Sequence, residues 1–581
     1  MVVENNKISV VSEKFPYLYI LRQSWTFLFS LIIPIIFSPL LFDYDNKPYL
    51  CLYVLIVMAL FWTFEPINLY MTSLLPVALF PLFGIATTDE TCFNYMKGTI
   101  MMFLGGLIMG IALEHSNFHR RIALKIIIFF GSSYRKLMAG IMLATMFQSM
   151  WINNTGTVAM MIPIVDSILS EITETSSREM MLVKTGSIKN QNNNETHIAI
   201  DSKQLNGNER KLQQETKKNE QTPLKVKSNN DETKTLRKAM LLSIVYAANI
   251  GGTASLTGTG TNLVLQEVFL IEFPGSTAIT FTTWMVYALP SALVTIFAAW
   301  IFLTYYFIND HDETPETAAK IQQLSIQKYE ELGSLTSHEI GVLIHFILLI
   351  TLWFFRYPGW TNLITDNKNQ IKDATPAILV AIMMFMIPAD FRQLFTNGEK
   401  GKTNGHTERL LNWRVVQSGI SWGLVFLLGG GFALAFGIQK SGLAKLFSEQ
   451  LARITLSPTM TTITLVLISV FVTQITSNVA TANIIIPVIC EMAVHMHVNP
   501  LMFIVPVTIA ISFAFMFPVS TPANAMVYDH LCMNVMEMAR PGLWMNLIAI
   551  AIQLVLINTF GIAVYDLNHF PGWAMPTNIT M

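Results

Sequence analysis

The chain has 581 residues, of which 52% are hydrophobic and 13% charged, and its formal net charge is −1. The charged fraction is about half that of an ordinary soluble protein, and many apolar runs approach the roughly 20 residues that cross a bilayer as helix. This indicates an all-α polytopic membrane protein, without the charge that nucleic-acid binding needs and without cysteine pairs at metal-ligand spacing.

The N-terminal part predicts a cytoplasmic segment followed by a first structural repeat. Residues 1–23 are polar and lack a signal-peptide pattern. They carry Lys14 and Arg22, which favours a cytoplasmic N-terminus under the positive-inside rule. We therefore expect the first repeat to begin at residue 24 and its first part to run over residues 24–169.

Two apolar segments in this repeat, Ile122–Phe130 and Leu137–Met150, are short for full membrane spans. Segments of this length are often re-entrant or interfacial. We interpret Leu137–Leu169 as a hairpin that turns back inside the membrane. Its tip would carry the motif Asn153-Asn154-Thr155.

Residues 170–237 are rich in Lys, Asn, Gln, Glu and Thr, which predicts a disordered cytoplasmic loop. The first repeat then continues over residues 238–308. It contains Gly251–Asn262, whose density of Gly and Thr predicts unwound backbone inside the protein, since such backbone is not tolerated against lipid. Residues 309–337 are charged and predict a connector at the membrane interface.

A second repeat is expected over residues 338–565. We interpret Leu443–Ile454 and Thr461–Ile475 as its hairpin pair, leading into Ser477-Asn478-Val479. A further break follows at 517–524, where Thr521-x-x-Asn524 repeats the pattern of Thr259-x-x-Asn262. The tail, residues 566–581, is expected outside the cell, which would make the sequon at Asn578 a glycosylation site.

The two hairpin tips share one pattern, in which an Asn stands three residues before a Thr and nine before a Pro. The members are separated by 324 residues: Asn154, Thr157 and Pro163 against Asn478, Thr481 and Pro487. The same offset relates further pairs: Gly105 and Gly429, Gly106 and Gly430, Phe147 and Phe471. A run of matches at one offset indicates an internal duplication, a common way of building a secondary transporter.

Four polar stretches, which we call the islands, therefore stand out in apolar sequence: 153–157, 251–262, 477–481 and 520–524. They offer hydroxyls, amides and backbone groups without formal charge, which suit a sodium ion. The helix N-termini that start there suit an anion. The alternative is that these residues only bridge helices, but four islands in duplicated register favour an anion site flanked by cations.

The membrane-proximal acids could form a proton relay, although helix capping or placement at the interface explains them more simply: Glu65, Glu114, Asp166, Asp390 and Asp529. No nucleophile elbow, phosphate loop or zinc motif appears, so the chain is not expected to be an enzyme or to hold an organic cofactor.

At the islands the sequence resembles the divalent anion/sodium symporter family, the solute carrier 13 group that includes the di- and tricarboxylate transporters and the insect INDY proteins. The resemblance runs from about Trp62 to Trp544 without the polar loop. It is carried by these segments: 62–66, 117–125, 153–155, 250–253, 429–435, 477–481 and 512–518.

The resemblance implies about eleven transmembrane helices and two re-entrant hairpins in inverted repeats. It also implies a homodimer in which a transport domain moves as an elevator against a scaffold domain. The substrate-binding residues it implies are Asn154, Thr155, Thr261, Asn478, Val479, Thr521 and Pro522. The sodium ligands it implies are Asn153, Asn154, Gly260, Thr473, Thr476, Asn478 and Ser520.

The chain departs from the family pattern at Asn153, which replaces a usual Ser, and at Gly156, which replaces a usual Ala. The first change favours a sodium-independent carboxylate exchanger as an alternative. Val479 and Thr521-Pro522 resemble the carboxylate branch and not the sulfate branch. We expect a plasma-membrane symporter of sodium with Krebs-cycle carboxylates such as succinate and citrate. A sulfate-type symporter and an anion channel also stay open at this point.

Overall fold

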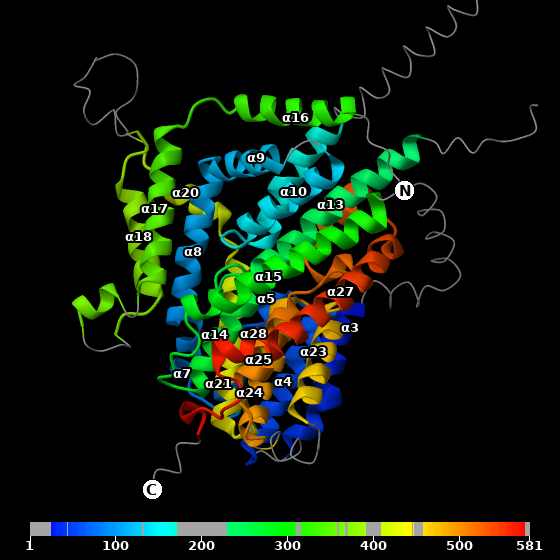
Figure 1. Ribbon diagram of the computed structural model, residues 1–581. Coiled ribbons are helices and arrows are strands. Elements are labelled where there is room, and N and C mark those ends of the chain that lie inside the picture. The colour runs from blue at the N-terminus through cyan, green and yellow to red at the C-terminus, as the bar shows by residue number, and fades with distance from the viewer. Residues whose placement is uncertain are drawn as a thin grey trace, which may run out of the picture.

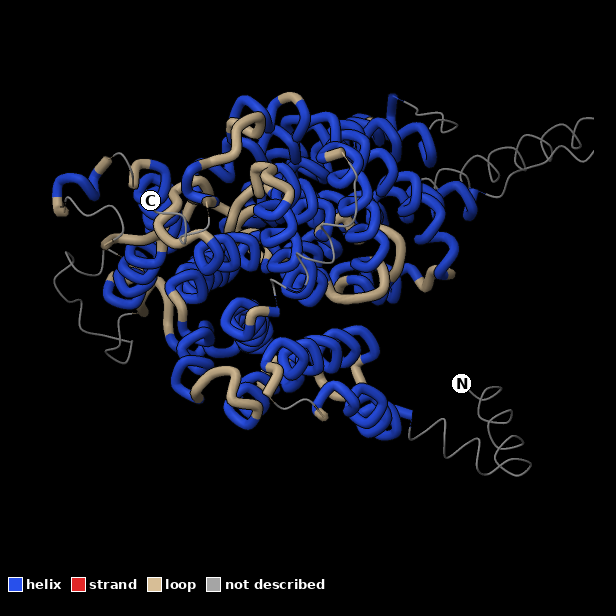
Figure 2. Tube along the Cα trace, turned by 90° about the horizontal axis from the view of Figure 1, so that it is seen from below, coloured by secondary structure: helices blue, strands red, loops and turns tan. Residues whose placement is uncertain are grey.

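The computed structural model is helical throughout the part of the chain that it describes (Figure 1). The described residues are 25–42, 45–130, 133–170, 229–308, 315–356, 359–365, 370–390, 408–443, 446 and 457–575. Viewed from below (Figure 2), these residues form helices joined by loops, without a strand in the described ranges.

One group of helices surrounds two glycine-rich helices, α8 (Gly98–His115) and α21 (Trp422–Ser441). Around α21 lie α4, α5, α6 and α7, and beside α8 stand α17 and α18. The bounds are α3 (Trp25–Phe37), α4 (Lys47–Phe64), α5 (Leu69–Thr72), α6 (Leu75–Leu82), α7 (Thr88–Phe93), α17 (Ser337–Phe354), α18 (Ala374–Met386) and α20 (Trp413–Gly419).

The glycines let these helices approach closely, as small residues do in membrane proteins. A Cβ on Gly105 would lie 2.6 Å from Ala377 Cβ on α18, and one on Gly429 or Gly430 would strike Tyr95 or Ser73. Three of the four glycines paired at one offset, Gly105, Gly429 and Gly430, thus stand where an added side chain would collide with a neighbouring segment.

A second group contains two hairpins and two interrupted helices. The first hairpin is α10 (Tyr134–Ser149) followed by a helix over 154–170, and the second is α23 (Pro458–Thr473) followed by α24 (Asn478–His495). The interrupted helices are α13–α14 (Asn229–Thr253, Gly260–Glu272) and α25–α26 (Leu501–Ile511, Pro522–Leu531). Long helices α15 (Phe281–Leu303, extended by η3, Thr304–Ile308) and α27 (Val535–Asn558, then α28, Phe560–Tyr565) pack beside them.

The two interrupted helices lie antiparallel. α13 packs against α26 and α14 against α25, so the first half of each helix lies beside the second half of the other. Their breaks therefore meet near the middle of the pair. This contact pattern is the one that an inverted repeat requires, although the full repeat and the number of spans remain predictions.

Among the described residues, seven helices are long and apolar enough to cross a membrane, within a fold whose other apolar helices are shorter. The short helices include α3, α18, α23 and α25. This agrees with a multi-pass membrane protein. Two helices lie across the end of this arrangement: α9 (Phe118–Phe130) and the expected connector, which forms α16 (Pro315–Glu330) (Figure 1).

Two sequence-based assignments were wrong in detail. The arms of the second hairpin are α23 and α24, so Leu443–Ile454 is not one of them, and most of that segment lies outside the described residues. α13 begins at Asn229, so the end of the loop predicted over 170–237 is helical. Elsewhere, α18 ends at Met386, where the chain turns to pair Pro388 with Arg409.

Several expectations fall outside the described residues and stay predictions. These are the cytoplasmic segment 1–23, the loop over 171–228 and the sequon at Asn578. The chain beyond residue 575, and with it the side of the membrane on which the tail lies, is likewise untested.

A buried ion pair joins α9 to α17 and to the turn before it. Arg121 and Glu339 are 6% and 4% exposed, with Arg121 Nε 3.0 Å from Glu339 Oε1. Arg121 also donates to the carbonyls of Leu332 and Gly333. The guanidinium thus donates hydrogen bonds both to a buried carboxylate and to the carbonyls of the turn that precedes α17.

We predict that Arg121→Ala will destabilise the protein strongly, because removing one partner leaves a buried charge uncompensated at a cost of about 3–5 kcal/mol. The neighbouring exposed Arg120 provides the matched control. A thermal unfolding series in detergent should show a large drop in midpoint for Arg121→Ala and almost none for Arg120→Ala. Equal midpoints for the two variants would contradict this role.

Candidate functional site

Each of the four islands contains the start of a helix. The helix over 154–170, α14, α24 and α26 begin at Asn154, Gly260, Asn478 and Pro522. A helix N-terminus carries a partial positive charge and exposes N–H groups that lack a partner within the helix. Starting four helices inside apolar surroundings therefore creates donors that the protein or a ligand must satisfy.

The caps of these helices differ. Asn153 Oδ1 accepts the Gly156 N–H at 2.7 Å, and Thr521 Oγ1 accepts the Asn524 N–H at 3.2 Å. Ser477 and Thr259 make no side-chain capping bond. The first-turn N–H groups of α24 and α14 are thus not taken up by a cap side chain, which is the arrangement that suits an anion.

The two hairpin tips are held by the same device. Ser149 Oγ lies 2.7 Å from Asn154 Oδ1 and 2.8 Å from the Ala248 carbonyl in the C-terminal part of α13. Thr473 Oγ1 lies 2.8 Å from Asn478 Oδ1 and from the Ile511 carbonyl at the end of α25. Each tip is therefore fixed to the interrupted helix of its own repeat. Ser149 was not predicted, although it stands 324 residues before Thr473, the offset that identified the tips.

A chain of side-chain amides joins the first hairpin to both interrupted helices. Asn154 Nδ2 donates to Asn249 Oδ1 at 3.2 Å, and Asn249 Nδ2 is 3.3 Å from Asn524 Oδ1. Asn524 Nδ2 in turn donates to the carbonyls of Ala514 and Phe517 in the second break. Buried amides in such a network are costly to leave unpaired, so the network fixes the relative position of three segments.

The second hairpin joins the same cluster. Gln474, just before its tip, donates through Nε2 to the Phe513 carbonyl and accepts the Met516 N–H through Oε1. Its own carbonyl accepts from Ser520 Oγ at 2.7 Å. Gln474 is thus a positioning residue that the sequence did not indicate, because it lies outside the repeated motif.

The two breaks also touch directly. Thr261 Oγ1 is 2.9 Å from Ser512 Oγ, and Asn262 Nδ2 donates to the carbonyls of Gly252 and Ser255. Of the predicted sodium ligands, Thr476 pairs its hydroxyl with Thr481 at 2.6 Å. The structure therefore brings all four islands together into one cluster.

Close backbone approach explains the glycines of the first break. A Cβ on Gly252 would lie 2.5 Å from Asn154 Oδ1, and one on Gly260 would lie 2.6 Å from Val479 Cγ2. Gly260 is thus the contact between the first break and the second hairpin tip. A larger residue at either position would push a hairpin tip away.

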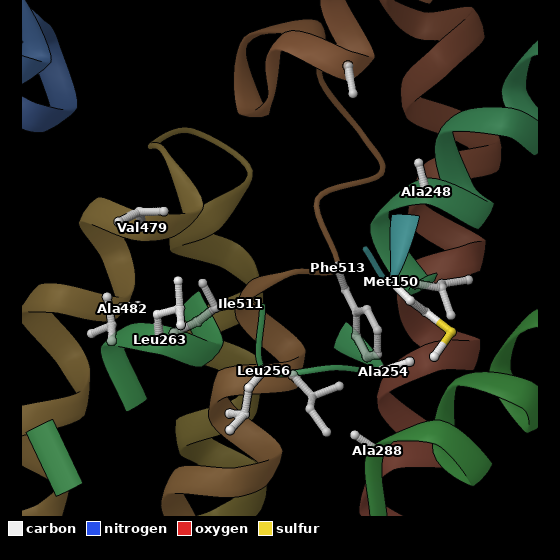
Figure 3. Close-up of a cluster of buried hydrophobic side chains, with 14 of the residues drawn as sticks. Met150, Ala248, Ala254, Leu256, Leu263, Ala288, Val479, Ala482, Ile511 and Phe513 are labelled. Carbon is white, nitrogen blue, oxygen red and sulfur yellow. The ribbon is translucent and has the colours of Figure 1, made fainter. Parts of the chain in front are cut away.

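Accessibility is uneven across the cluster. The tip residues 153–156 are partly exposed, as are Ser477, Thr259, Gly260 and Thr521, and Pro522 is exposed. The remaining predicted site residues are buried: Thr261, Thr473, Thr476, Asn478, Val479 and Ser520. Val479 belongs to a cluster of buried hydrophobic side chains that also contains Leu263, Ala482 and Ile511, from α14, α24 and α25 (Figure 3). The first tip and the start of α26 thus form the accessible side of a polar cluster that rests on apolar side chains.

The cluster offers groups suited to either sign of charge without a charged side chain. Four helix starts favour an anion, while the C-terminal carbonyls of α13 and α25, with hydroxyl and amide oxygens, favour a hard cation such as sodium. No group of three or more His, Cys, Asp or Glu side chains that could hold a metal occurs in the described ranges.

The helices α8 and α21 face this cluster. A Cβ on Gly106 would lie 3.4 Å from Thr257 Cγ2 in the first break, and one on Gly110 would lie 3.2 Å from the Trp151 carbonyl. Gly431 is in direct contact with Asn483 of α24. Small residues thus line both helices where they meet the hairpins.

Comparison with known proteins gives consistent results. The family model described as the sodium:sulfate symporter transmembrane region matches residues 21–567. The chain is 37% identical over 577 residues to the rat Na(+)/citrate cotransporter, covering 95% of this chain and 98% of that protein. It is 36% identical over 572 residues to the Drosophila melanogaster protein I'm not dead yet, covering 95% and 91%.

Another relative and a solved structure extend the comparison. The rat Na(+)/dicarboxylate cotransporter 3 is 33% identical over 564 residues, covering 94% of this chain and 93% of that protein. The solved structure of the Neisseria gonorrhoeae efflux pump MtrF has a TM-score of 0.50 at 12% identity, covering 82% of this chain and 84% of its own. At that identity the likeness concerns the fold alone.

We predict that Gly260→Ala will lower thermal stability, because its Cβ would overlap Val479 Cγ2, and overpacking typically costs about 1–3 kcal/mol. Val479→Ala removes that methyl group, so the double variant should recover much of the loss. Unfolding midpoints of both single variants and the double variant measure this coupling. Gly572→Ala, where a Cβ would meet nothing within 4 Å, is the control. Strictly additive losses would contradict the contact.

Proposed function

The chain belongs to the sodium:sulfate symporter family, and we propose that it carries di- and tricarboxylates such as succinate and citrate across the plasma membrane. Members of this family, and the relatives compared above, are transporters, so the protein is a multi-pass membrane transporter and not an enzyme. The proposal concerns its substrate, its coupling ion and its motion.

The observation that carries the proposal is the meeting of four helix N-termini in one uncharged cluster. The two hairpin tips, at which Asn154 and Asn478 begin the following helices, would offer N–H groups and amides from opposite repeats. This suits a substrate with a carboxylate at each end. The names of the relatives, which are cotransporters of citrate and dicarboxylates, support the same class. Val479 and Thr521-Pro522 also resemble the carboxylate branch.

Sodium is proposed as the co-substrate. The oxygens that would receive it at the first tip are those of Asn153, Asn154 and Gly260. At the second tip they are those of Thr473, Thr476, Asn478 and Ser520. These oxygen ligands are neutral and lie beside the carbonyl ends of α13 and α25, which fits a hard monovalent cation. The names of the relatives as Na(+) cotransporters support this choice.

One contact favours the sodium-independent exchanger as the second candidate. Asn153 Oδ1 already accepts the Gly156 N–H, so one of its two lone pairs is committed to capping the helix. Ser477, its counterpart in the other repeat, makes no such bond. Asn153 in place of the usual Ser would therefore weaken sodium binding at the first tip.

The elevator motion, the homodimer and the orientation with a cytoplasmic N-terminus and an extracellular C-terminus rest on the family resemblance. The glycine-lined contacts of α8 and α21 with the hairpins support sliding of the second group of helices against the first. A sulfate-type symporter and an anion channel are the competing functions that transport measurements would separate.

We predict that Asn154→Ala and Asn478→Ala will each abolish uptake while the protein still reaches the cell surface. Each change removes an amide that orients a tip and a partner of Ser149 or Thr473. Uptake of labelled succinate, normalised to surface-biotinylated protein, measures the effect. Thr464→Ala, on the exposed face of α23, is the matched control and should transport normally. Normal uptake by either Asn variant would refute the site.

Reconstituted protein should take up labelled succinate and citrate, with saturation and at carrier-like rates. Replacing external sodium by choline should remove net uptake if the protein is a symporter. Uptake that survives in choline would identify the exchanger, and transport of sulfate in place of both carboxylates would move the protein to the other branch. Unitary currents in planar bilayers would instead indicate a channel.

A further inference from the structure

One ion pair joins the two groups of helices. Lys97, which precedes α8 in the first group, places its Nζ 3.0 Å from Oε1 of Glu267 on α14 in the second group. Thr99, in the first turn of α8, donates through Oγ1 to the other carboxylate oxygen, Oε2, at 2.5 Å. Both oxygens of a carboxylate from the second group are therefore bound by side chains of the first group.

The contact is shielded from solvent. The Lys97 and Glu267 side chains are 15% and 8% exposed, and Thr99 is buried. Charges in such a place are screened much less by water and salt than those of a surface pair. Removing one partner leaves the other charge poorly solvated and uncompensated, which is costly.

Glu267 has no alternative cation along the helices that α14 packs against in the first group, α8 and α21. Residues 100–113 of α8 and 422–439 of α21 contain no charged side chain. Sliding α14 along these helices would therefore break the pair without forming an equivalent one on them. The pair is specific to one register of the two groups, the register of this structure.

No other ion pair among the described residues joins a helix of the first group to one of the second. The pairs that stay within one group are Lys440–Glu90, Arg356–Asp373, Arg237–Asp166, His530–Asp166 and Lys238–Glu537. Arg121–Glu339 instead holds α9, which lies across the end of the arrangement. Elsewhere α8 and α21 meet the second group through glycines. The contact of Glu267 with Lys97 and Thr99 is therefore a local ionic restraint on an otherwise small-residue boundary.

We propose that Lys97, Thr99 and Glu267 form a latch, which holds the two groups in this register and opens during the transport cycle. This rests on the function proposed above, in which the second group slides against the first. Glu267 lies about two helical turns after Gly260, the predicted sodium ligand at the start of α14. The latch thus acts on a helix that begins at the candidate site, and its strength sets how readily that helix leaves this position.

The test measures the register itself, by pulsed electron paramagnetic resonance on the full-length protein in nanodiscs. Spin labels at Arg414→Cys on α20 and Met536→Cys on α27, both exposed positions, report the distance between the two groups. The exposed Cys92 and Cys532 are replaced by Ser so that they do not react with the label.

We expect Glu267→Gln to lower the ratio of this register to any other about tenfold or more, because Lys97 loses its shielded partner. Thr99→Val removes one hydrogen bond to the carboxylate and keeps the ion pair. It should therefore shift the ratio in the same direction by less.

Glu90→Gln is the matched control, since it breaks an ion pair with Lys440 that lies within the first group, and it should leave the distances unchanged. Exchanging the charges, as Lys97→Glu with Glu267→Lys, restores the attraction and should recover the original register. Loss of folding in the single variant could not produce that recovery.

Unchanged distances in the Glu267→Gln protein would overturn the latch, as would a charge-exchanged protein that still resembles Glu267→Gln. Because the readout is a distance and not uptake, this result is separate from the proposed function. The proposed function would fail instead through absent carboxylate uptake by the unmodified chain.

Discussion

Four helices begin inside the protein, and the N–H groups at their starts need partners that lipid cannot give. In water such groups would be solvated, but at membrane depth each unmet donor is expensive. The protein meets part of this demand with Asn153 and Thr521 as caps and leaves the starts of α14 and α24 without a side-chain cap. Because all four helix starts need polar partners, they are less costly to bury when they meet in one polar region. The cluster of islands is the result.

The amide chain from Asn154 through Asn249 to Asn524 gives this region its shape. Each amide both donates and accepts, so a change at one position is felt by segments from both repeats. Ser149 and Thr473 repeat the same bonding at the two tips. Such a network holds uncharged groups in fixed places. This suits the substrate site that we propose, because a charged substrate could leave it without stranding a buried ionised side chain.

Glycine determines how closely the two groups of helices approach. On α8 and α21 it allows contact with the breaks and with α24, and Gly260 allows the second tip to reach the first break. Helices that meet through small residues have few interlocking side chains to separate when they slide. An ion pair between the two groups, such as Lys97–Glu267, adds a local restraint.

The sequence by itself determined the membrane class and the four islands, because hydropathy and polar residues in apolar runs are local signals. Its constant offset of 324 residues predicts a duplication. It also placed the helix starts at Asn154 and Asn478. It misassigned the arms of the second hairpin and missed Asn249, Gln474 and Ser149 as positioning residues. Only the tertiary structure decided these, since which amide meets which carbonyl depends on two interrupted helices lying antiparallel, and chain spacing does not record that contact.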